Sequence, residues 1–166
     1  MVGPGGIGDP DGLGEIVAYH ELGGDAQGTG TARRLRCLGA AAGHQGGIIA
    51  KIQESGLRVV ALKSLRLSKA QAEGFYAVHS ARPFFGSLVS FMTQGPVVAM
   101  ILEGDNAIQR WRDLMGPTDA TKAPKNTLRG TYGTSIEANA THGSDAVDTA
   151  AYEMGFFFSG LELAGL

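Results

Sequence analysis

The chain has 166 residues, with 14 basic and 16 acidic side chains and a formal net charge of −2 at pH 7. The length excludes several packed domains, because one domain usually takes about 100–150 residues. The near-balance of charge excludes a general nucleic-acid coat and a membrane-surface binder, which usually carry a strong basic excess. Because 14 of the 26 glycines lie in the first 47 residues, we expect residues 1–30 to be a disordered Gly-rich extension. Residues 31–166 form the expected domain, with a divergent start over 31–47.

The single cysteine, Cys37, allows no internal disulfide and no cysteine-based metal site. A reducing compartment is therefore the expected location, and we expect the protein to be cytoplasmic. The longest apolar run, Val97–Leu102, is the length of a strand and far below the roughly 18–20 residues that span a bilayer. No basic start followed by an apolar stretch indicates a signal peptide.

In chain order, Leu13–Tyr19 is the one part of the extension that could form a short element. Ile48 and Ile52 lie at helical spacing, and Gly56 suits the end of that helix. The apolar pattern over residues 57–67 then predicts a strand.

Ser68 is a suitable N-cap for a helix that runs to about His79, and Pro83 follows as a breaker. A helix of about ten residues comes next and ends at Gly95. Its expected apolar face consists of Phe84, Leu88, Phe91 and Met92.

Pro96–Glu103 is apolar on both faces, which predicts a central strand. Residues 106–115 predict a helix, residues 116–126 a polar loop, and Ser144 or Asp145 caps a last helix that reaches Met154. Strands that alternate with helices in about 120 residues indicate a two-layer α+β sandwich.

The segment Asn139–Asp145 (NATHGSD) places His142 just before the last helix. Backbone N–H groups and a partial positive charge gather at a helix start. Such a position suits an imidazole that accepts and hands over an anionic group such as phosphate. Glu153, on the same helix, could fold back to orient the ring. The alternative, that His142 is an ordinary loop histidine, stays open from composition alone.

Arginines in or beside loops form a second candidate feature: Arg82, Arg112 and Arg129, with Thr118 nearby in sequence. An arginine fork matches phosphate oxygens, although each arginine alone is more often a surface ion-pair partner. No phosphate-cradling P-loop and no dinucleotide fingerprint after a strand is present. An aromatic residue at a helix start can stack on a nucleobase, and we interpret Phe84 in this way and Phe85 as a core residue.

Together these residues resemble the nucleoside diphosphate kinase family, from about Gly47 to Glu162. The His-Gly-Ser-Asp run in that context is highly specific for the family. The matching runs are Tyr76, Arg82-Pro83-Phe84-Phe85, Leu88, Gly95–Met100, Arg112, Gly116, Thr118, Thr127–Gly130 and Asn139–Asp145.

The resemblance implies a ferredoxin-like α+β sandwich with an antiparallel sheet, assembled as a homo-tetramer or homo-hexamer. It also implies transfer of the γ-phosphate of a nucleoside triphosphate to a nucleoside diphosphate, with Mg²⁺ bridging the phosphates and with broad tolerance of the base. The histidine is phosphorylated in a ping-pong cycle. By position, His142 is the nucleophile and Glu153 orients it. The nucleotide-binding residues implied by position are Tyr76, Phe84, Leu88, Arg112, Thr118, Arg129, Asn139 and Ser144.

The chain departs from the family pattern mainly before Gly47. The family's first strand ends in Lys-Pro-Asp, and this motif is absent, so we expect an atypical or missing first strand. By counting, Arg36 falls at the lysine position, but its neighbours do not match. Ala120 also replaces a common proline in a loop that makes subunit contacts, and Thr131 replaces a common aspartate.

Three hypotheses therefore stay open. The first is an active nucleoside diphosphate kinase, supported by the complete set of matched site residues after Gly47. The second is a catalytically impaired homologue that binds nucleotide or a protein partner without turnover, supported by the missing lysine motif. The third is a structural, oligomer-forming domain, which would have no need of Asn139, His142 and Glu153 together.

Overall fold

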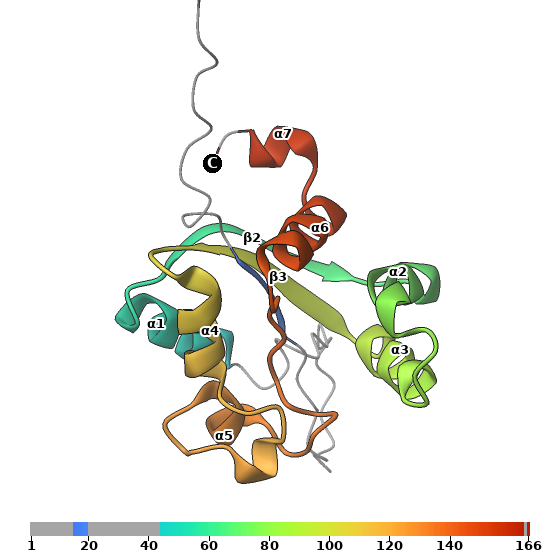
Figure 1. Cartoon of the computed structure of the whole chain (residues 1–166), viewed down its shortest axis with the longest axis horizontal. Helices are drawn as coiled ribbons and strands as arrows, with labels where there is room; N and C mark the ends of the chain where they lie inside the picture. Colours follow the sequence, from blue (N-terminus) through green and yellow to red (C-terminus); the bar gives the residue numbers. More distant parts are fainter. Residues whose placement is uncertain (1–14, 20–43, 165) are drawn as a thin grey trace, which may run out of the picture.

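The computed structural model describes residues 15–19, 44–164 and 166 (Figure 1). Strands and helices alternate along these residues, as expected for an α+β fold. In chain order the elements are β1 (Glu15–Tyr19), α1 (Gln45–Glu54), β2 (Arg58–Arg66), α2 (Lys69–Phe75), the 3-10 turn η2 (Ala77–His79), α3 (Phe85–Thr93), β3 (Pro96–Glu103), α4 (Ala107–Met115), η3 (Ala120–Lys122), α5 (Leu128–Tyr132), α6 (Val147–Phe157) and α7 (Gly160–Leu163).

The sheet has the strand order β1-β3-β2, and both pairings are antiparallel. The prediction that Pro96–Glu103 is a central strand is confirmed, because β3 is paired on both edges and its residues 97–102 are buried. Alternate side chains of β3 enter two separate clusters. Val97 and Ile101 pack with α2, α3 and α6, whereas Met100 packs with α1 and α4. Each such buried side chain stabilises the fold by about 1.5–3 kcal/mol.

The strand beside β3 comes from Glu15–Tyr19, within the segment that we expected to be a disordered extension. Its residues pair from Glu15–Leu102 to Tyr19–Val98. A central strand needs backbone partners on both edges, and the β-branched and aromatic residues of EIVAY suit this position. A strand is therefore present beside β3, and it is formed by Glu15–Tyr19 instead of by residues within 31–47. Residues 1–14 and 20–43, including Arg36, lie outside the described residues.

Most helix limits follow local sequence signals. Ser68 caps α2, since its side chain accepts from the Gln71 N–H and the Gln71 side chain accepts from the Ser68 N–H. The prediction that Ser144 or Asp145 caps the last helix is wrong, because α6 begins at Val147 after Ala146. Instead, the Thr149 hydroxyl accepts from the Ala146 N–H at 3.0 Å.

Across the described part of the chain, no helix has the length and apolar character needed to cross a bilayer.

Candidate active site

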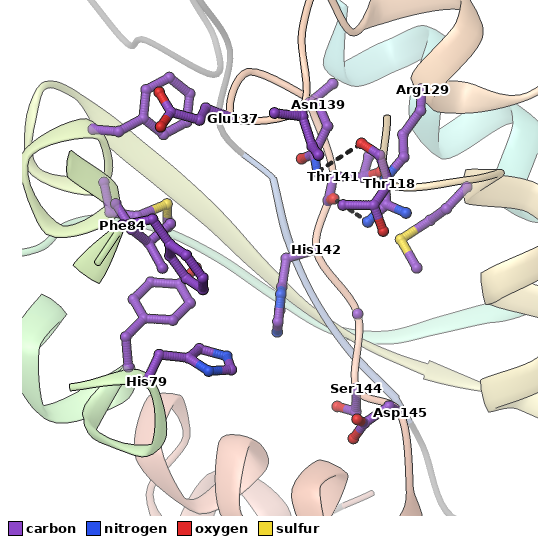
Figure 2. Close-up of a pocket in the computed structure, with 18 of the residues that line it drawn as sticks. His79, Phe84, Thr118, Arg129, Glu137, Asn139, Thr141, His142, Ser144 and Asp145 are labelled. Carbon is purple, nitrogen blue, oxygen red and sulfur yellow. Dashed lines mark hydrogen bonds between the residues drawn. The ribbon is translucent and has the colours of Figure 1, made fainter. Parts of the chain in front are cut away.

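A cavity of about 650 Å³ opens between α3, the end of α4 and the segment that precedes α6. His142 points into this cavity, between a wall that carries His79 and Phe84 and a wall that carries Thr118 and Arg129 (Figure 2). The catalytic and nucleotide-binding residues that the resemblance implies all line it: Tyr76, Phe84, Leu88, Arg112, Thr118, Arg129, Asn139, His142, Ser144 and Glu153. Arg82, the other arginine singled out in the sequence, is not among the lining residues. Residues spread over more than 70 positions of sequence therefore meet around one space.

His142 is held from two sides. Its ring Nε2 lies 3.1 Å from Oε1 of Glu153 on α6. The hydroxyl of Ser144 donates to the other carboxylate oxygen, Oε2, at 2.9 Å, and the buried Trp111 Nε1–H donates to the backbone carbonyl of His142 at 3.2 Å. A carboxylate that accepts from one ring nitrogen selects the tautomer with the proton on that nitrogen. The other nitrogen, Nδ1, then keeps its lone pair.

The backbone before His142 turns sharply. Ala140 has a φ of 70°, in the left-handed region that non-glycine residues adopt only where the surroundings impose it. The Thr141 N–H donates to the Asn139 carbonyl across this turn at 2.9 Å. The Asn139 side chain donates in turn to the Thr118 carbonyl at 3.3 Å. This turn joins the loop after α4 to the segment that carries His142.

Arg129 is the buried cation of the cavity. Its Nη1 donates to the Gly116 carbonyl at 2.8 Å and its Nη2 to the Thr141 carbonyl at 3.0 Å. Burial, and then the positive charge of Arg112, lowers the pKa of Arg129 to about 10. The guanidinium thus stays charged at neutral pH but has only neutral carbonyls as partners within the described residues. A buried cation of this kind favours an anion in the adjacent space.

Tyr76 lies against the histidine, with ring centroids 6.1 Å apart and the ring planes at 84°. Burial, and then the negative charge of Glu153, raises the pKa of Tyr76 well above its ordinary value. Its hydroxyl therefore stays protonated and can act as a hydrogen-bond donor at neutral pH. Phe84 is 46% exposed at the cavity wall, and its stacking on a base stays a prediction. Phe85 packs against the core, as its interpretation as a core residue requires.

Several lining residues received no role in the sequence analysis, among them His79, Thr141 and Glu137. His79 stacks on Tyr76 with ring centroids 6.4 Å apart, and the spacing of three residues from Tyr76 is a signal that could have found it. Thr141 is buried, and its hydroxyl has no hydrogen-bond partner among the residues that the structure describes. Glu137 lies on the loop before Asn139, and no local signal separates it from a solvent-exposed glutamate.

Comparison with known proteins agrees with this geometry. The family described as nucleoside diphosphate kinase matches residues 36–163. The chain belongs to the nucleoside diphosphate kinase family. It is 57% identical over 121 residues to "Nucleoside diphosphate kinase" of Oleidesulfovibrio alaskensis, a match that covers 73% of this chain and 87% of that protein. Against "Nucleoside diphosphate kinase" of Acidiphilium cryptum the identity is 58% over 120 residues, or 72% and 86% of the two chains.

Solved structures of the family have the same fold. The nucleoside diphosphate kinase of Aquifex aeolicus superposes with a TM-score of 0.77 at 37% identity and covers 90% of this chain and 96% of its own. The enzyme of Halobacterium salinarum in complex with CDP superposes with a TM-score of 0.77 at 35% identity, over 91% and 90%. The ferredoxin-like α+β fold is thereby confirmed, and as a member of this family the chain is a nucleotide phosphotransferase.

Within residues 15–19 and 44–166, apart from residue 165, no three His, Cys, Asp or Glu side chains gather as metal ligands. The carboxylates nearest the histidine are engaged, since Glu153 binds His142 and Ser144, and Asp145 accepts from the Thr149 hydroxyl at 2.9 Å. This donor set fits a divalent cation that arrives on the phosphates of a nucleotide.

Proposed function

We propose that the cavity transfers the γ-phosphate of a nucleoside triphosphate to a nucleoside diphosphate through a phosphohistidine on His142. The observation that carries this proposal is the pairing of the His142 Nε2 with Glu153 at 3.1 Å, inside a cavity with a buried arginine. Glu153 occupies Nε2, so Nδ1 is the nitrogen with a lone pair for attack. The Ser144 hydroxyl holds the second oxygen of Glu153 and so fixes the carboxylate.

In the first half of the cycle, Nδ1 forms a bond to the γ-phosphorus and the bond from that phosphorus to the β–γ bridging oxygen breaks. The electron pair of the broken bond leaves with the nucleoside diphosphate. Glu153 stabilises the positive charge that develops on the imidazole by accepting its Nε2–H. In the second half, a terminal oxygen of an acceptor diphosphate attacks the phosphohistidine, and the Nδ1–P bond breaks.

The remaining lining residues have roles in binding. Arg129 and Arg112 balance the phosphate charge, Thr118 lies on the same wall, and the neutral Tyr76 hydroxyl donates beside His142. Mg²⁺ enters as part of the nucleotide substrate and neutralises phosphate charge there.

At the opposite wall Phe84 stacks on the base with Leu88 beside it. Asn139, whose side chain is bonded to the Thr118 carbonyl, contacts the sugar. Stacking on one aromatic face tolerates every base, which supports broad base specificity. The exposed position of Phe84 supports its stacking role.

We further propose a cytoplasmic homo-oligomer, a tetramer or hexamer. In the described sheet β2 pairs only with β3, so its second edge presents unpaired backbone groups that another chain can bind. Light scattering coupled to size exclusion measures the assembly, and a monomer at micromolar concentration would contradict this proposal.

The test of the reaction is direct labelling. Incubation with γ-labelled ATP and Mg²⁺ is expected to produce an acid-labile phosphoprotein that loses its label when a nucleoside diphosphate is added. His142→Ala is expected to remain unlabelled, whereas His44→Ala, which changes a histidine outside the cavity lining, keeps the label. An unlabelled wild-type protein would exclude the mechanism, and label on His142→Ala would exclude the assigned nucleophile.

A further inference from the structure

A third carboxylate, that of Glu137, lines the cavity at the far end from Ser144 and Asp145 (Figure 2). Glu137 lies on the loop between α5 and His142. The Thr134 N–H holds this loop by donating to the Ala138 carbonyl at 2.8 Å, and the Ala138 N–H donates to the Ser135 hydroxyl at 2.9 Å. The carboxylate therefore sits on a hydrogen-bonded turn at the rim of the cavity.

Glu137 reaches across the rim to α3. Its Oε1 lies 3.3 Å from the hydroxyl of Ser87, and that same hydroxyl lies 2.9 Å from the backbone carbonyl of Phe84. The Glu137 carboxylate is thus placed beside the start of α3, where the Phe84 ring forms the cavity wall.

The Glu137 carboxylate accepts at most one weak hydrogen bond from the described residues. A serine hydroxyl carries one hydrogen, and the Phe84 carbonyl at 2.9 Å is the better-placed acceptor than Glu137 Oε1 at 3.3 Å. Within the part of the chain that the structure describes, Glu137 has no other hydrogen-bond partner. Glu153 and Asp145, in contrast, each accept a short bond from a side chain. Glu137 therefore presents free acceptor positions to whatever enters the outer end of the cavity.

A bound nucleotide would place a specific group there, and this step rests on the proposed function. With the phosphates at His142 and Arg129 and the base on Phe84, the sugar lies between them. The hydrogen-bonding edge of a base lies away from its bond to the sugar, so that edge points outward along the Phe84 wall. Glu137 is the acidic side chain on that side of the cavity, and His79 is a second ionisable side chain on the Phe84 wall.

We propose that Glu137 sets the order of preference among the bases that stack on the Phe84 ring. In this order guanine comes first. Guanine offers two parallel donors, N1–H and the 2-amino group, to the two oxygens of one carboxylate. Adenine and cytosine each offer one amino group. Uracil and thymine offer one N–H that lies between two carbonyl oxygens, and these oxygens repel the carboxylate. Ser87 is a positioning residue that limits the directions in which Glu137 can point.

The experiment uses isolated, labelled phosphoenzyme and measures the rate of its discharge onto GDP, inosine diphosphate and UDP. In the wild-type protein the expected order is GDP, then inosine diphosphate, which lacks the 2-amino group, then UDP. Glu137→Ala is expected to lower the GDP-to-UDP ratio by about fivefold, because the bonds that it removes are charge-assisted but partly exposed to solvent. Glu137→Gln is expected to lower the ratio by raising the UDP rate, since the amide NH₂ can donate to a uracil carbonyl.

The matched control is Glu54→Ala, which removes the same charge from an exposed site on α1, outside the cavity. Its GDP-to-UDP ratio is expected to equal that of the wild type. A purely structural role of Glu137 would slow discharge onto all three acceptors equally, and this outcome would overturn the proposal. So would an unchanged ratio in both Glu137 variants.

Equilibrium binding of GDP and UDP, measured by calorimetry, tests the same ranking without turnover. Suppose that the wild-type protein forms no phosphohistidine but binds GDP more tightly than UDP, and that Glu137→Ala abolishes this preference. This result would exclude the proposed reaction and retain this inference. A wild-type protein that transfers phosphate but binds GDP and UDP with equal affinity would support the proposed reaction and exclude this inference.

Discussion

The two ends of the cavity differ in burial and in how their polar groups are engaged. At the inner end Thr141 and Ser144 are 2% and 1% exposed, and Arg129 and Glu153 each hold two partners. At the outer end Phe84 and Ile136 are 46% and 60% exposed. Electrostatic interactions are stronger where water is excluded. The inner end is therefore suited to one chemical step, and the outer end to many different bases.

This difference predicts that substitutions at the inner end reduce activity by orders of magnitude, whereas substitutions at the outer end reduce it severalfold. Four measurements test this contrast between the two ends of the cavity.

The largest effect is expected for Arg129→Ala. The variant loses the buried cation that we propose faces the phosphates, and a loss of about 10²–10³-fold in kcat/KM is typical when one preorganised donor is removed from a reacting group. The Gly116 and Thr141 carbonyls also lose their donors, which costs about 1–3 kcal/mol of unfolding free energy per buried group. Steady-state kinetics and urea unfolding measure the two losses.

Arg110→Ala is the matched control for this variant, because Arg110 is an exposed arginine of α4 outside the cavity lining. Its kinetics are expected to match the wild type. Equal losses in the two arginine variants would show that position within the cavity does not matter.

Glu153→Gln is expected to reduce the rate of phosphohistidine formation by about 10²-fold, with little change in nucleotide affinity. The amide keeps the size of the carboxylate but not the negative charge that stabilises the imidazolium, and its NH₂ group can turn towards Nε2 and select the wrong tautomer. Single-turnover labelling with γ-labelled ATP separates this rate from binding. A rise in KM with an unchanged labelling rate would place Glu153 in binding instead.

Phe84→Ala is expected to weaken nucleotide binding about fivefold while the labelling rate at saturating nucleotide stays near that of the wild type. Stacking on an aromatic ring contributes about 1–3 kcal/mol per base, and the partial exposure of Phe84 places it at the lower limit. Tyr152→Ala, at a 56% exposed tyrosine outside the cavity, is the control. A hundredfold loss in the Phe84 variant would remove the contrast between the two ends.

The smallest effect concerns pH and Tyr76. Burial raises the pKa of Tyr76, so the folded state disfavours its ionisation. The unfolded chain ionises tyrosine near pH 10. The contribution of Tyr76 to stability is therefore complete below about pH 10 and is lost as the pH rises above it. Tyr76→Phe is expected to lose less unfolding free energy than the wild type between pH 8 and pH 11, as measured in urea. Parallel curves would show that Tyr76 is not buried as described.

Elements with a strong local pattern could be predicted from the sequence. The isoleucine spacing of α1, the Ser68 cap of α2 and the continuous apolar run of β3 each depend on neighbouring residues. The residues around the cavity followed from the resemblance to a family, because contacts between residues so far apart in sequence leave no local periodicity.

Elements that depend on distant contacts were missed or misplaced. The sequence indicates a short element over Leu13–Tyr19, but only the pairing of β1 with β3 shows that it is a strand of the sheet. The short helix α5 is set by close packing, since a Cβ on Gly130 would lie 2.0 Å from the Pro124 carbonyl oxygen. Ser144 has the residue type of a helix cap, but its hydroxyl binds Glu153 nine positions later. In each of these cases a tertiary contact outweighs the local preference.

Trp111 is the only tryptophan of the chain, and it is fully buried with its indole N–H bonded to the backbone carbonyl of His142. The tryptophan fluorescence of the protein therefore arises from a chromophore one hydrogen bond away from the residue that we propose takes up phosphate. A shift of that backbone, or a new charge on the imidazole, changes the field at the indole ring. We therefore expect the fluorescence of Trp111 to change in both halves of the proposed cycle, so that stopped flow can follow them without a label.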